Sequence, residues 1–214
     1  MENNTLKVKR LVLGSVMTNT YFVYNDKKDL VIIDPADIAL VEQEIKNIGI
    51  SPSAVLNTHG HFDHIIGNGV CDCGVFIQEQ DEKMLFSAQG NLSALFGDQE
   101  VIFEKGSLRI NTIEDGDVLS FGGLKFEVFH SPGHTQGSVC FRIGKFLFTG
   151  DTLFKGAIGR VDLPGASEKK LFSSLERLLD IDEDLKVMPG HGAETNLKAE
   201  RGSNIFLLGR RVNR

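Results

Sequence analysis

Three of the six histidines in this 214-residue chain lie in one short run, His59-Gly60-His61-Phe62-Asp63-His64. The run brings together three imidazoles and one carboxylate, and all four side chains are common metal ligands. Packing and solvation do not require four such groups at this spacing, whereas a metal ion or an adjacent pair of ions does. We therefore predict that His59, His61, Asp63 and His64 bind metal.

Three further polar residues, His134, Asp151 and His191, stand shortly after apolar β-like runs, as His59 does. The carboxyl ends of neighbouring strands meet at one edge of a sheet, so these side chains are expected to converge. Seven candidates exceed the three or four protein ligands of one zinc ion, which predicts two ions. Asp151 is the predicted bridge, because a carboxylate offers two oxygens and an imidazole gives one nitrogen to a metal.

A pair of ions held in this way supplies a bridging hydroxide as nucleophile at neutral pH, without a serine or cysteine. We expect Asp151 and Asp63 to be the catalytic carboxylates, with Asp63 also orienting the nucleophile. Glycine or proline beside His134, Asp151 and His191 predicts tight turns that expose these side chains. His130 is interpreted as structural or as a support for a neighbouring ligand, because it stands at the end of a predicted strand and no partner requires it as a ligand.

The elements that must position these residues are short strands followed by helices in both halves of the chain. Strands are predicted at Leu6–Val12, Thr20–Tyr24, Leu30–Ile33, Ala54–Leu56, Val118–Phe121, Leu124–Phe129, Val139–Ile143, Phe146–Phe148 and Leu185–Met188. Helices are predicted over 38–48, 168–179 and 198–208, and a helical, then irregular and mobile segment over 78–104 should flank the site. The pattern indicates one α/β domain over residues 1–214, built as a four-layered αββα sandwich.

The composition is that of a soluble protein, with 41% hydrophobic and 24% charged residues and a formal net charge of −6. This charge argues against a nucleic-acid partner, and no apolar run approaches the roughly 20 residues that span a membrane. The segment from Met1 to Lys7 lacks the apolar core of a signal peptide. Cys71, Cys73 and Cys140 are expected to be reduced thiols, since a one-residue spacer would strain a disulfide. We therefore expect a cytoplasmic monomer or homodimer.

These motifs resemble those of the metallo-β-lactamase superfamily. Thr58-His59-Gly60-His61-Phe62-Asp63-His64 is similar to its THxHxDH signature. Ser131-Pro132-Gly133-His134-Thr135, Gly150-Asp151 and Pro189-Gly190-His191-Gly192 follow in the order of the remaining metal motifs, so the resemblance covers nearly the whole chain. It implies the αββα fold, with one ion on His59, His61 and His134, the other on Asp63, His64 and His191, and Asp151 bridging both.

Within that superfamily the chain is most similar to short glyoxalase II-like hydrolases, through Gly150–Phe154, Ile158–Gly165 and an ending that contains Glu200-Arg201. Glyoxalase II itself carries a further C-terminal helical domain that holds glutathione, and this sequence stops at Arg214 without it. The resemblance implies cleavage of a small-molecule thioester such as S-lactoylglutathione, with the thiol carrier left open. Zinc is the expected ion, and iron or manganese could take its place.

Gly159, Arg160 and Asp162 also resemble an element of persulfide dioxygenases of the same fold, which use one iron on two histidines and a carboxylate. In this chain, His59, His134 and Asp151 could form that triad. Arg160 and Asp162 are therefore candidate substrate-adjacent residues, and an ion pair at a loop corner is their structural interpretation. The superfamily resemblance is also compatible with a lactonase and with a non-catalytic metal-binding scaffold. The presence of all seven ligand candidates argues against the scaffold.

Overall fold

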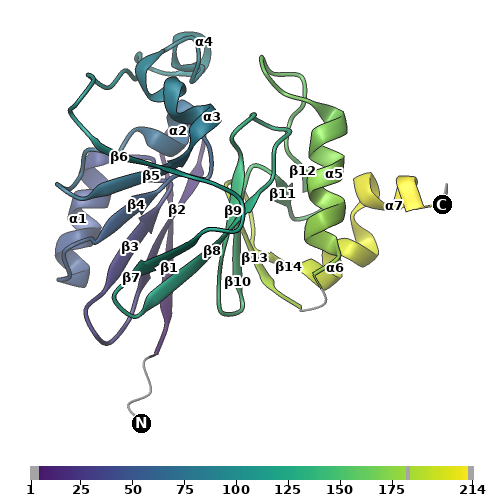
Figure 1. The fold of residues 1–214 in the computed structure, drawn as a ribbon, viewed down its shortest axis with the longest axis horizontal. Helices are drawn as coiled ribbons and strands as arrows, with labels where there is room; N and C mark the ends of the chain where they lie inside the picture. Colours follow the sequence, from purple (N-terminus) through teal and green to yellow (C-terminus); the bar gives the residue numbers. More distant parts are fainter. Residues whose placement is uncertain (1–4, 182–183, 212–214) are drawn as a thin grey trace.

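The structure is a computed structural model of the chain and describes residues 5–181 and 184–211. Its strands form two six-stranded sheets and one two-stranded ribbon (Figure 1). The first sheet has the order β1 (Lys7–Leu13), β2 (Thr18–Tyr24), β3 (Leu30–Ile33), β4 (Ala54–Leu56), β5 (Gly74–Gln78), β6 (Arg109–Ile113). The second has the order β14 (Thr195–Asn196), β13 (Lys186–Pro189), β10 (Phe146–Gly150), β9 (Val139–Ile143), β8 (Leu124–His130), β7 (Val118–Phe121). The ribbon pairs β11 (Leu153–Phe154) with β12 (Ala157–Ile158).

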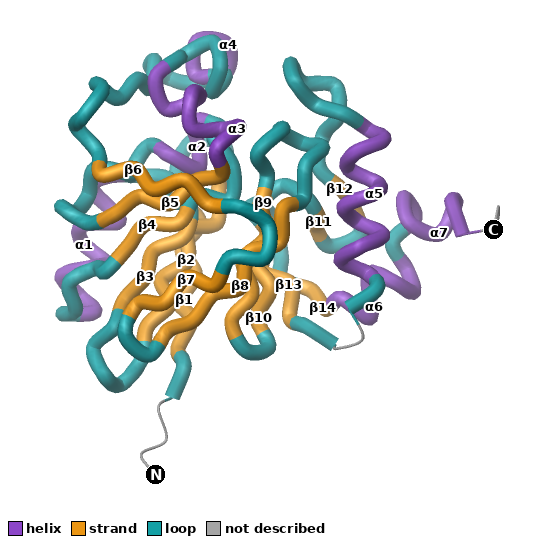
Figure 2. Tube along the Cα trace, in the orientation of Figure 1, coloured by secondary structure: helices purple, strands orange, loops and turns teal. Residues whose placement is uncertain are grey.

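Helices lie outside the two sheets and at one end of them (Figure 2). They are α1 (Ile38–Ile48), α2 (Phe62–Ile65), α3 (Glu79–Glu82), the 3-10 helix η1 (Lys83–Phe86), α4 (Ser93–Phe96), α5 (Glu168–Leu179), α6 (Leu197–Ser203) and α7 (Ile205–Arg211). In Figure 1, α1 covers the outer face of the first sheet, and α5 to α7 lie beyond the second. The predicted four-layered αββα sandwich is therefore confirmed.

Each central strand is apolar on both faces because both faces are covered. On β3, Val31 and Ile33 point into the core between the sheets, whereas Leu30 and Ile32 belong to the core beneath α1. On the second sheet, Phe141 joins the core between the sheets, and the neighbouring Cys140 packs in the core beneath α5. This alternation follows from the two-residue period of a strand, and it fixes the register of each sheet.

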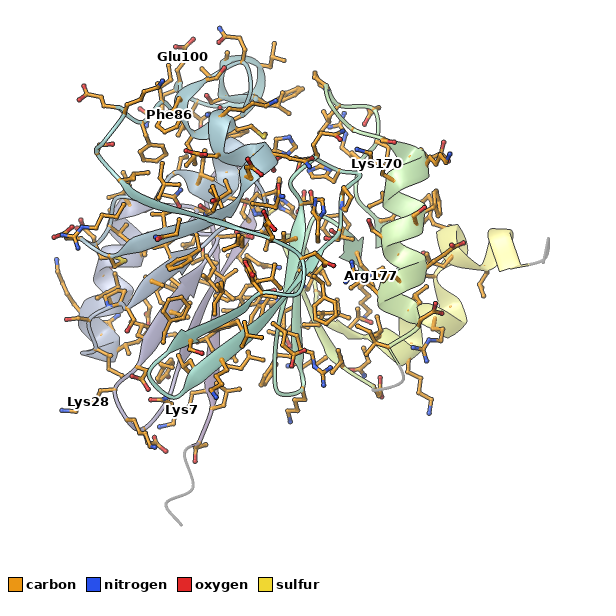
Figure 3. The ribbon with its side chains drawn as sticks, viewed as in Figure 1. Lys7, Lys28, Phe86, Glu100, Lys170 and Arg177 are labelled. Atoms are coloured by element: carbon orange, nitrogen blue, oxygen red, sulfur yellow. A yellow bond between two sulfur atoms is a disulfide. The ribbon has the colours of Figure 1, made fainter. Side chains whose placement is uncertain are left out.

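The two long outer helices begin and end where their sequences favour it. Asp37 caps α1 by accepting a hydrogen bond from the Leu40 N–H at 2.8 Å, and Gly49 ends it in the left-handed region at φ +71°. Ser167 caps α5 in the same way as Asp37 caps α1. Arg177, near the end of α5 (Figure 3), donates to Asp115 at 2.8 Å and ties the helix to the turn before β7.

Most predicted elements are confirmed within one or two residues, and the exceptions have local causes. The sequence does not predict β5, because its apolar run is only Val75 to Ile77, and β6 is too polar to stand out. The predicted closing helix over 198–208 is wrong as a single helix. It divides into α6 and α7 at Asn204, whose side chain accepts from the Phe206 N–H and donates to the Ala157 carbonyl.

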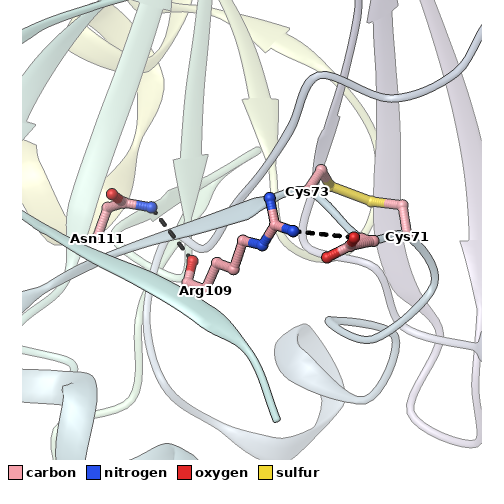
Figure 4. The surroundings of a disulfide bond; sticks show 5 residues. Cys71, Cys73, Arg109 and Asn111 are labelled. Atoms are coloured by element: carbon pink, nitrogen blue, oxygen red, sulfur yellow. Dashed lines mark hydrogen bonds and ion pairs between the residues drawn. A yellow bond between two sulfur atoms is a disulfide. The ribbon is translucent and has the colours of Figure 1, made fainter. Parts of the chain in front are cut away.

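The expectation of three reduced cysteines is wrong for two of them. Cys71 and Cys73 form a disulfide in the bend before β5, where their Cα atoms lie 5.3 Å apart (Figure 4). Asp72, between them, forms an ion pair with Arg109 of β6 at 3.0 Å. Cys140 is a buried free thiol, and burial raises its pKa to about 11. The disulfide removes part of the argument for a cytoplasmic location.

Several expectations stay predictions. No helix in the described ranges 5–181 and 184–211 is long and apolar enough to cross a membrane. The start of the segment interpreted as lacking a signal peptide, residues 1–4, lies outside the described residues. The single domain, the cytoplasmic location and the monomeric or homodimeric state remain predictions.

We expect Phe126→Ala to lower the free energy of unfolding by about 3–5 kcal/mol, because a fully buried ring between the two sheets is replaced by a cavity. Phe206→Ala is a matched control on α7, where the ring is 46% exposed, and should cost about 1 kcal/mol or less. Urea unfolding of both variants measures the difference. Equal losses would contradict the placement of the core.

Candidate metal centre

The predicted ligands come together at one end of the two sheets, each just beyond the end of a strand or on α2. His59 and His61 follow β4, His134 follows β8, and Asp151 directly follows β10. His191 follows β13, while Asp63 and His64 lie on α2. The structure thus brings all seven side chains into three overlapping groups, and in each group the candidate ligand atoms lie within 4.8 Å of one another.

The first group consists of three buried imidazoles whose nitrogens face one point. His59 Nε2 lies 3.0 Å from His61 Nδ1, and His61 Nδ1 lies 2.9 Å from His134 Nε2. Three nitrogens bound to one tetrahedral zinc ion at its usual bond length lie about 3.3 Å apart. The separations here are close to that value, so the three rings need little movement to hold one ion.

The second group, His59, His64 and Asp151, overlaps both of the others, and the third contains Asp63, His64 and His191. Asp63 Oδ2 lies 3.2 Å from His64 Nε2 and 3.3 Å from His191 Nε2. Asp151 stands between the first and third groups. Its Oδ2 is 3.6 Å from both His134 Nε2 and His191 Nε2, and its Oδ1 is 3.5 Å from His64 Nε2. A carboxylate in this position can reach an ion in either group.

The protons of the outer ring nitrogens are fixed, so the inner lone pairs point into the site. His134 Nδ1 lies 3.0 Å from the Arg160 carbonyl, which can only accept, so this nitrogen donates and Nε2 is left free to bind metal. The Thr58 hydroxyl gives its proton to Asp34 at 2.7 Å and therefore accepts from His59 Nδ1 at 3.1 Å. Because the neutral His59 ring carries its proton on Nδ1, its Nε2 is unprotonated and free to bind metal.

Two buried atoms of the cluster have no hydrogen-bond partner: His64 Nε2 and Asp151 Oδ1. An unsatisfied buried polar atom costs roughly 1–3 kcal/mol, and more when the group is charged. Both atoms face the centre of the site, and both belong to residue types that bind divalent metals. The donor set therefore fits a metal centre on its own geometry.

The pKa values of the ligands reflect burial and their neighbours. Burial, together with the adjacent imidazoles, holds the pKa values of His59 and His61 well below the usual range, so both are neutral near pH 7. Burial opposes charge on His64 as well, but the carboxylates of Asp63, Asp34 and Asp151 raise its pKa well above the usual value. Metal binding at His64 must displace this proton, so binding is linked to pH.

Sequence reasoning missed three residues that hold the ligands in place. Asp34 accepts from His64 Nδ1 at 2.9 Å and from both the N–H and the hydroxyl of Thr58. Thr18 donates to Asp63 Oδ2 at 2.6 Å. Asp34 carried a usable signal, because it directly follows the apolar run Leu30–Ile33, as the predicted ligands follow theirs. Thr18 carried none.

The third such residue, Asp81, joins the two loops that supply the first group. Its Oδ2 accepts from the Gly60 N–H at 3.0 Å, between His59 and His61. The same oxygen accepts from the Thr135 hydroxyl at 2.6 Å, and Oδ1 accepts from the Gly137 N–H at 2.8 Å, both just beyond His134. Burial raises the pKa of Asp81 despite these three hydrogen bonds.

The remaining predicted residues lie at the edge of the site. Arg160 donates two hydrogen bonds to Asp162, each of 2.9 Å, and both side chains are exposed, so the loop-corner pair exists but is not buried. It is the main chain of Arg160 that holds His134. His130 Nε2 contacts the Gln136 carbonyl at 2.9 Å, and His130 is absent from the ligand groups of the described residues.

Comparisons with known proteins agree with this geometry. The family model described as the metallo-beta-lactamase superfamily matches residues 13–191. Hydroxyacylglutathione hydrolase GloC of Haemophilus influenzae is 32% identical over 211 residues, which cover 94% of this chain and 98% of that protein.

Two solved structures are similar in both sequence and fold. The BLEG-1 B3 metallo-beta-lactamase has a TM-score of 0.85 and 34% identity, covering 94% of this chain and 99% of its own. TTHA1623, solved in a di-iron-bound form, has a TM-score of 0.81 and 35% identity, covering 93% of this chain and all of its own. The similarity therefore extends across the ligand-bearing ends of both sheets.

Asp81 contacts the loops that supply the first group, whereas Asp34 contacts His64 directly and His59 only through Thr58. We therefore predict that the two carboxylates act mainly on different ions. Asp81→Asn replaces an accepting oxygen with a donor and should weaken one metal-binding constant by about tenfold. Asp34→Asn, which alters the partner of His64, should weaken the other by about tenfold to a hundredfold. Titration against a competing chelator yields both constants, and unfolding of the metal-free variants controls for folding. If both substitutions weakened the same constant most strongly, the assignment would be contradicted.

Proposed function

Because the chain belongs to the metallo-beta-lactamase superfamily, we propose that it is a hydrolase that holds two divalent ions and cleaves a thioester. The observation that carries this proposal is the pair of facing ligand groups with Asp151 between them. In the proposal, His59, His61 and His134 hold one ion and Asp63, His64 and His191 the other. The di-iron form of TTHA1623 supports a two-ion centre, and the choice of zinc, iron or manganese depends on supply.

Ions bound at these residues supply positive charge that polarises the substrate carbonyl and lowers the pKa of water to near neutrality. The protein supplies orientation. Thr18 donates to Asp63 Oδ2, so this carboxylate is fixed in direction beside His64 and His191. Asp151, whose oxygens lie 3.5–3.6 Å from His64, His134 and His191, would place negative charge between two ions bound at these groups. A departing thiolate is a weak base, so the reaction needs no strong general acid.

The thioester specificity is supported by the similarity to hydroxyacylglutathione hydrolase GloC over 94% of the chain. The similarity to BLEG-1, at 34% identity, supports hydrolysis of a β-lactam as the second candidate. Both substrates present a carbonyl that is attacked by activated water, so the ligand geometry alone serves either. A lactone offers the same kind of carbonyl. The single-iron dioxygenase would use only His59, His134 and Asp151.

The proposal is tested by metal content and substrate range together. We expect two ions per chain in protein that is purified without chelator and reconstituted with zinc or iron. Such protein should hydrolyse S-lactoylglutathione faster than a lactone or a penicillin, and a chelator should abolish the reaction. One iron per chain that excludes a second metal would refute the two-ion hydrolase and favour the dioxygenase.

Asp151→Asn should reduce kcat/KM by about a hundredfold or more, because the amide keeps the shape but loses the charge between the ions. His130→Ala, a change in a histidine of the adjoining strand, should retain most of the activity, since His130 contacts a main-chain carbonyl and not the ligand groups. Thioester hydrolysis and metal content of both variants measure this. Full activity in Asp151→Asn with two bound ions would contradict the bridging role.

A further inference from the structure

A cavity of about 370 Å³ opens onto the ligand cluster, and its remaining walls are apolar except for Arg160. Five of the seven ligand candidates line it: His61, Asp63, His134, Asp151 and His191. The apolar walls come from segments far apart in the sequence: Val16, Phe62, Leu92, Phe96, Phe154 and Leu163. A substrate whose carbonyl reaches the ligands through this cavity therefore contacts these side chains.

The walls include exposed apolar side chains held at the mouth of the cavity. Phe96, on α4, is 53% exposed, and Val16, in the turn between β1 and β2, is 39% exposed. In Figure 1, α4 lies at the end of the sheets where α2 carries Asp63 and His64. Exposed apolar groups of this kind gain free energy when a ligand covers them.

The backbone beside these walls adopts an unfavourable conformation. Leu92 has φ +69°, and Met17, next to Val16, has φ +59°. The left-handed region costs a residue with a Cβ atom roughly 1–2 kcal/mol, and such conformations concentrate at binding sites. Leu92 is almost fully buried and lines the cavity, so its unfavourable backbone conformation places an apolar side chain in the cavity wall.

Charge in the cavity does not favour an anionic group outside the metal centre. Among the described residues that line it, Arg160 is the one charged side chain beyond the ligand candidates. Its guanidinium is already engaged by Asp162 through two hydrogen bonds of 2.9 Å. A thiol carrier that bears carboxylates or phosphates is therefore poorly matched to these walls. We expect such a carrier to lie outside the cavity and the acyl half of the thioester to contact the walls.

We propose that the acyl group bound in this cavity is apolar, so that the protein prefers aliphatic or aromatic acyl thioesters over short hydroxyacyl ones. This inference rests on the proposed thioester hydrolysis and adds the class of acyl group. Phe96 is the specificity-determining residue that a substitution can test, because it is exposed and its truncation leaves the buried core intact.

The test uses metal-loaded protein and thioesters of uncharged N-acetylcysteamine with lactoyl, acetyl, butyryl and hexanoyl groups. From acetyl to hexanoyl, kcat/KM should rise about twofold to fourfold for each added methylene, and the lactoyl thioester should be slower than the butyryl one. Phe96→Ala should flatten the series mainly through KM. Phe206→Ala, a matched phenylalanine on α7, should leave the slope unchanged.

A parallel binding measurement separates this inference from the proposed function. Methyl and hexyl ketone analogues, in which a methylene replaces the thioester sulfur, are titrated calorimetrically into the same protein. Tighter binding of the hexyl analogue that is lost in Phe96→Ala supports the apolar cavity, even if no thioester is cleaved and the hydrolase proposal fails. Thioester cleavage with a flat acyl series, or with a slope that survives Phe96→Ala, overturns the apolar preference alone.

Discussion

Burial of negative charge at one end of the two sheets is the constraint on which the rest of the structure depends. Asp34, Asp63 and Asp151 lie together at or near full burial, beside imidazoles that burial keeps neutral. A buried carboxylate without a compensating charge is costly. In the metal-free chain, burial lowers the pKa values of His64 and His191, but the nearby carboxylates outweigh it and raise both. A proton held on either ring offsets part of the buried negative charge.

The two sheets are joined by hydrogen bonds at this same end. Asn19 of β2 donates from its side chain to the Pro189 carbonyl at 2.8 Å, and the Tyr21 hydroxyl donates to the same carbonyl at 2.7 Å. In the opposite direction, the Val139 N–H of β9 donates to the Thr58 carbonyl at 2.8 Å. The interface between the sheets therefore holds ligands that come from different sheets. A change in the packing between the sheets would also change the distances between the ligands.

The ligands and most strands can be predicted from the sequence because both carry strong local patterns. The run from His59 to His64 is compact, and strands such as β3 and β4 are continuous apolar segments. Asp81 cannot be predicted in the same way. It lies in a polar segment of α3, and its partners are two main-chain N–H groups and a hydroxyl that are 21 to 56 residues away, which no local pattern reports. The disulfide likewise depends on the bend around Asp72 and not on cysteine count.

The glycines beside the ligands are predicted to form turns, and the structure shows that turn formation is only part of their role. Gly150 does adopt a left-handed conformation at φ +47°. Gly190 does not. A Cβ atom there would lie 2.3 Å from Asp151 Oδ1 and 2.8 Å from the His64 ring, so this position must be glycine for the two ligands to pack against the main chain. Glycine is required at position 190 because the side chains of Asp151 and His64 occupy the space that a Cβ atom would need.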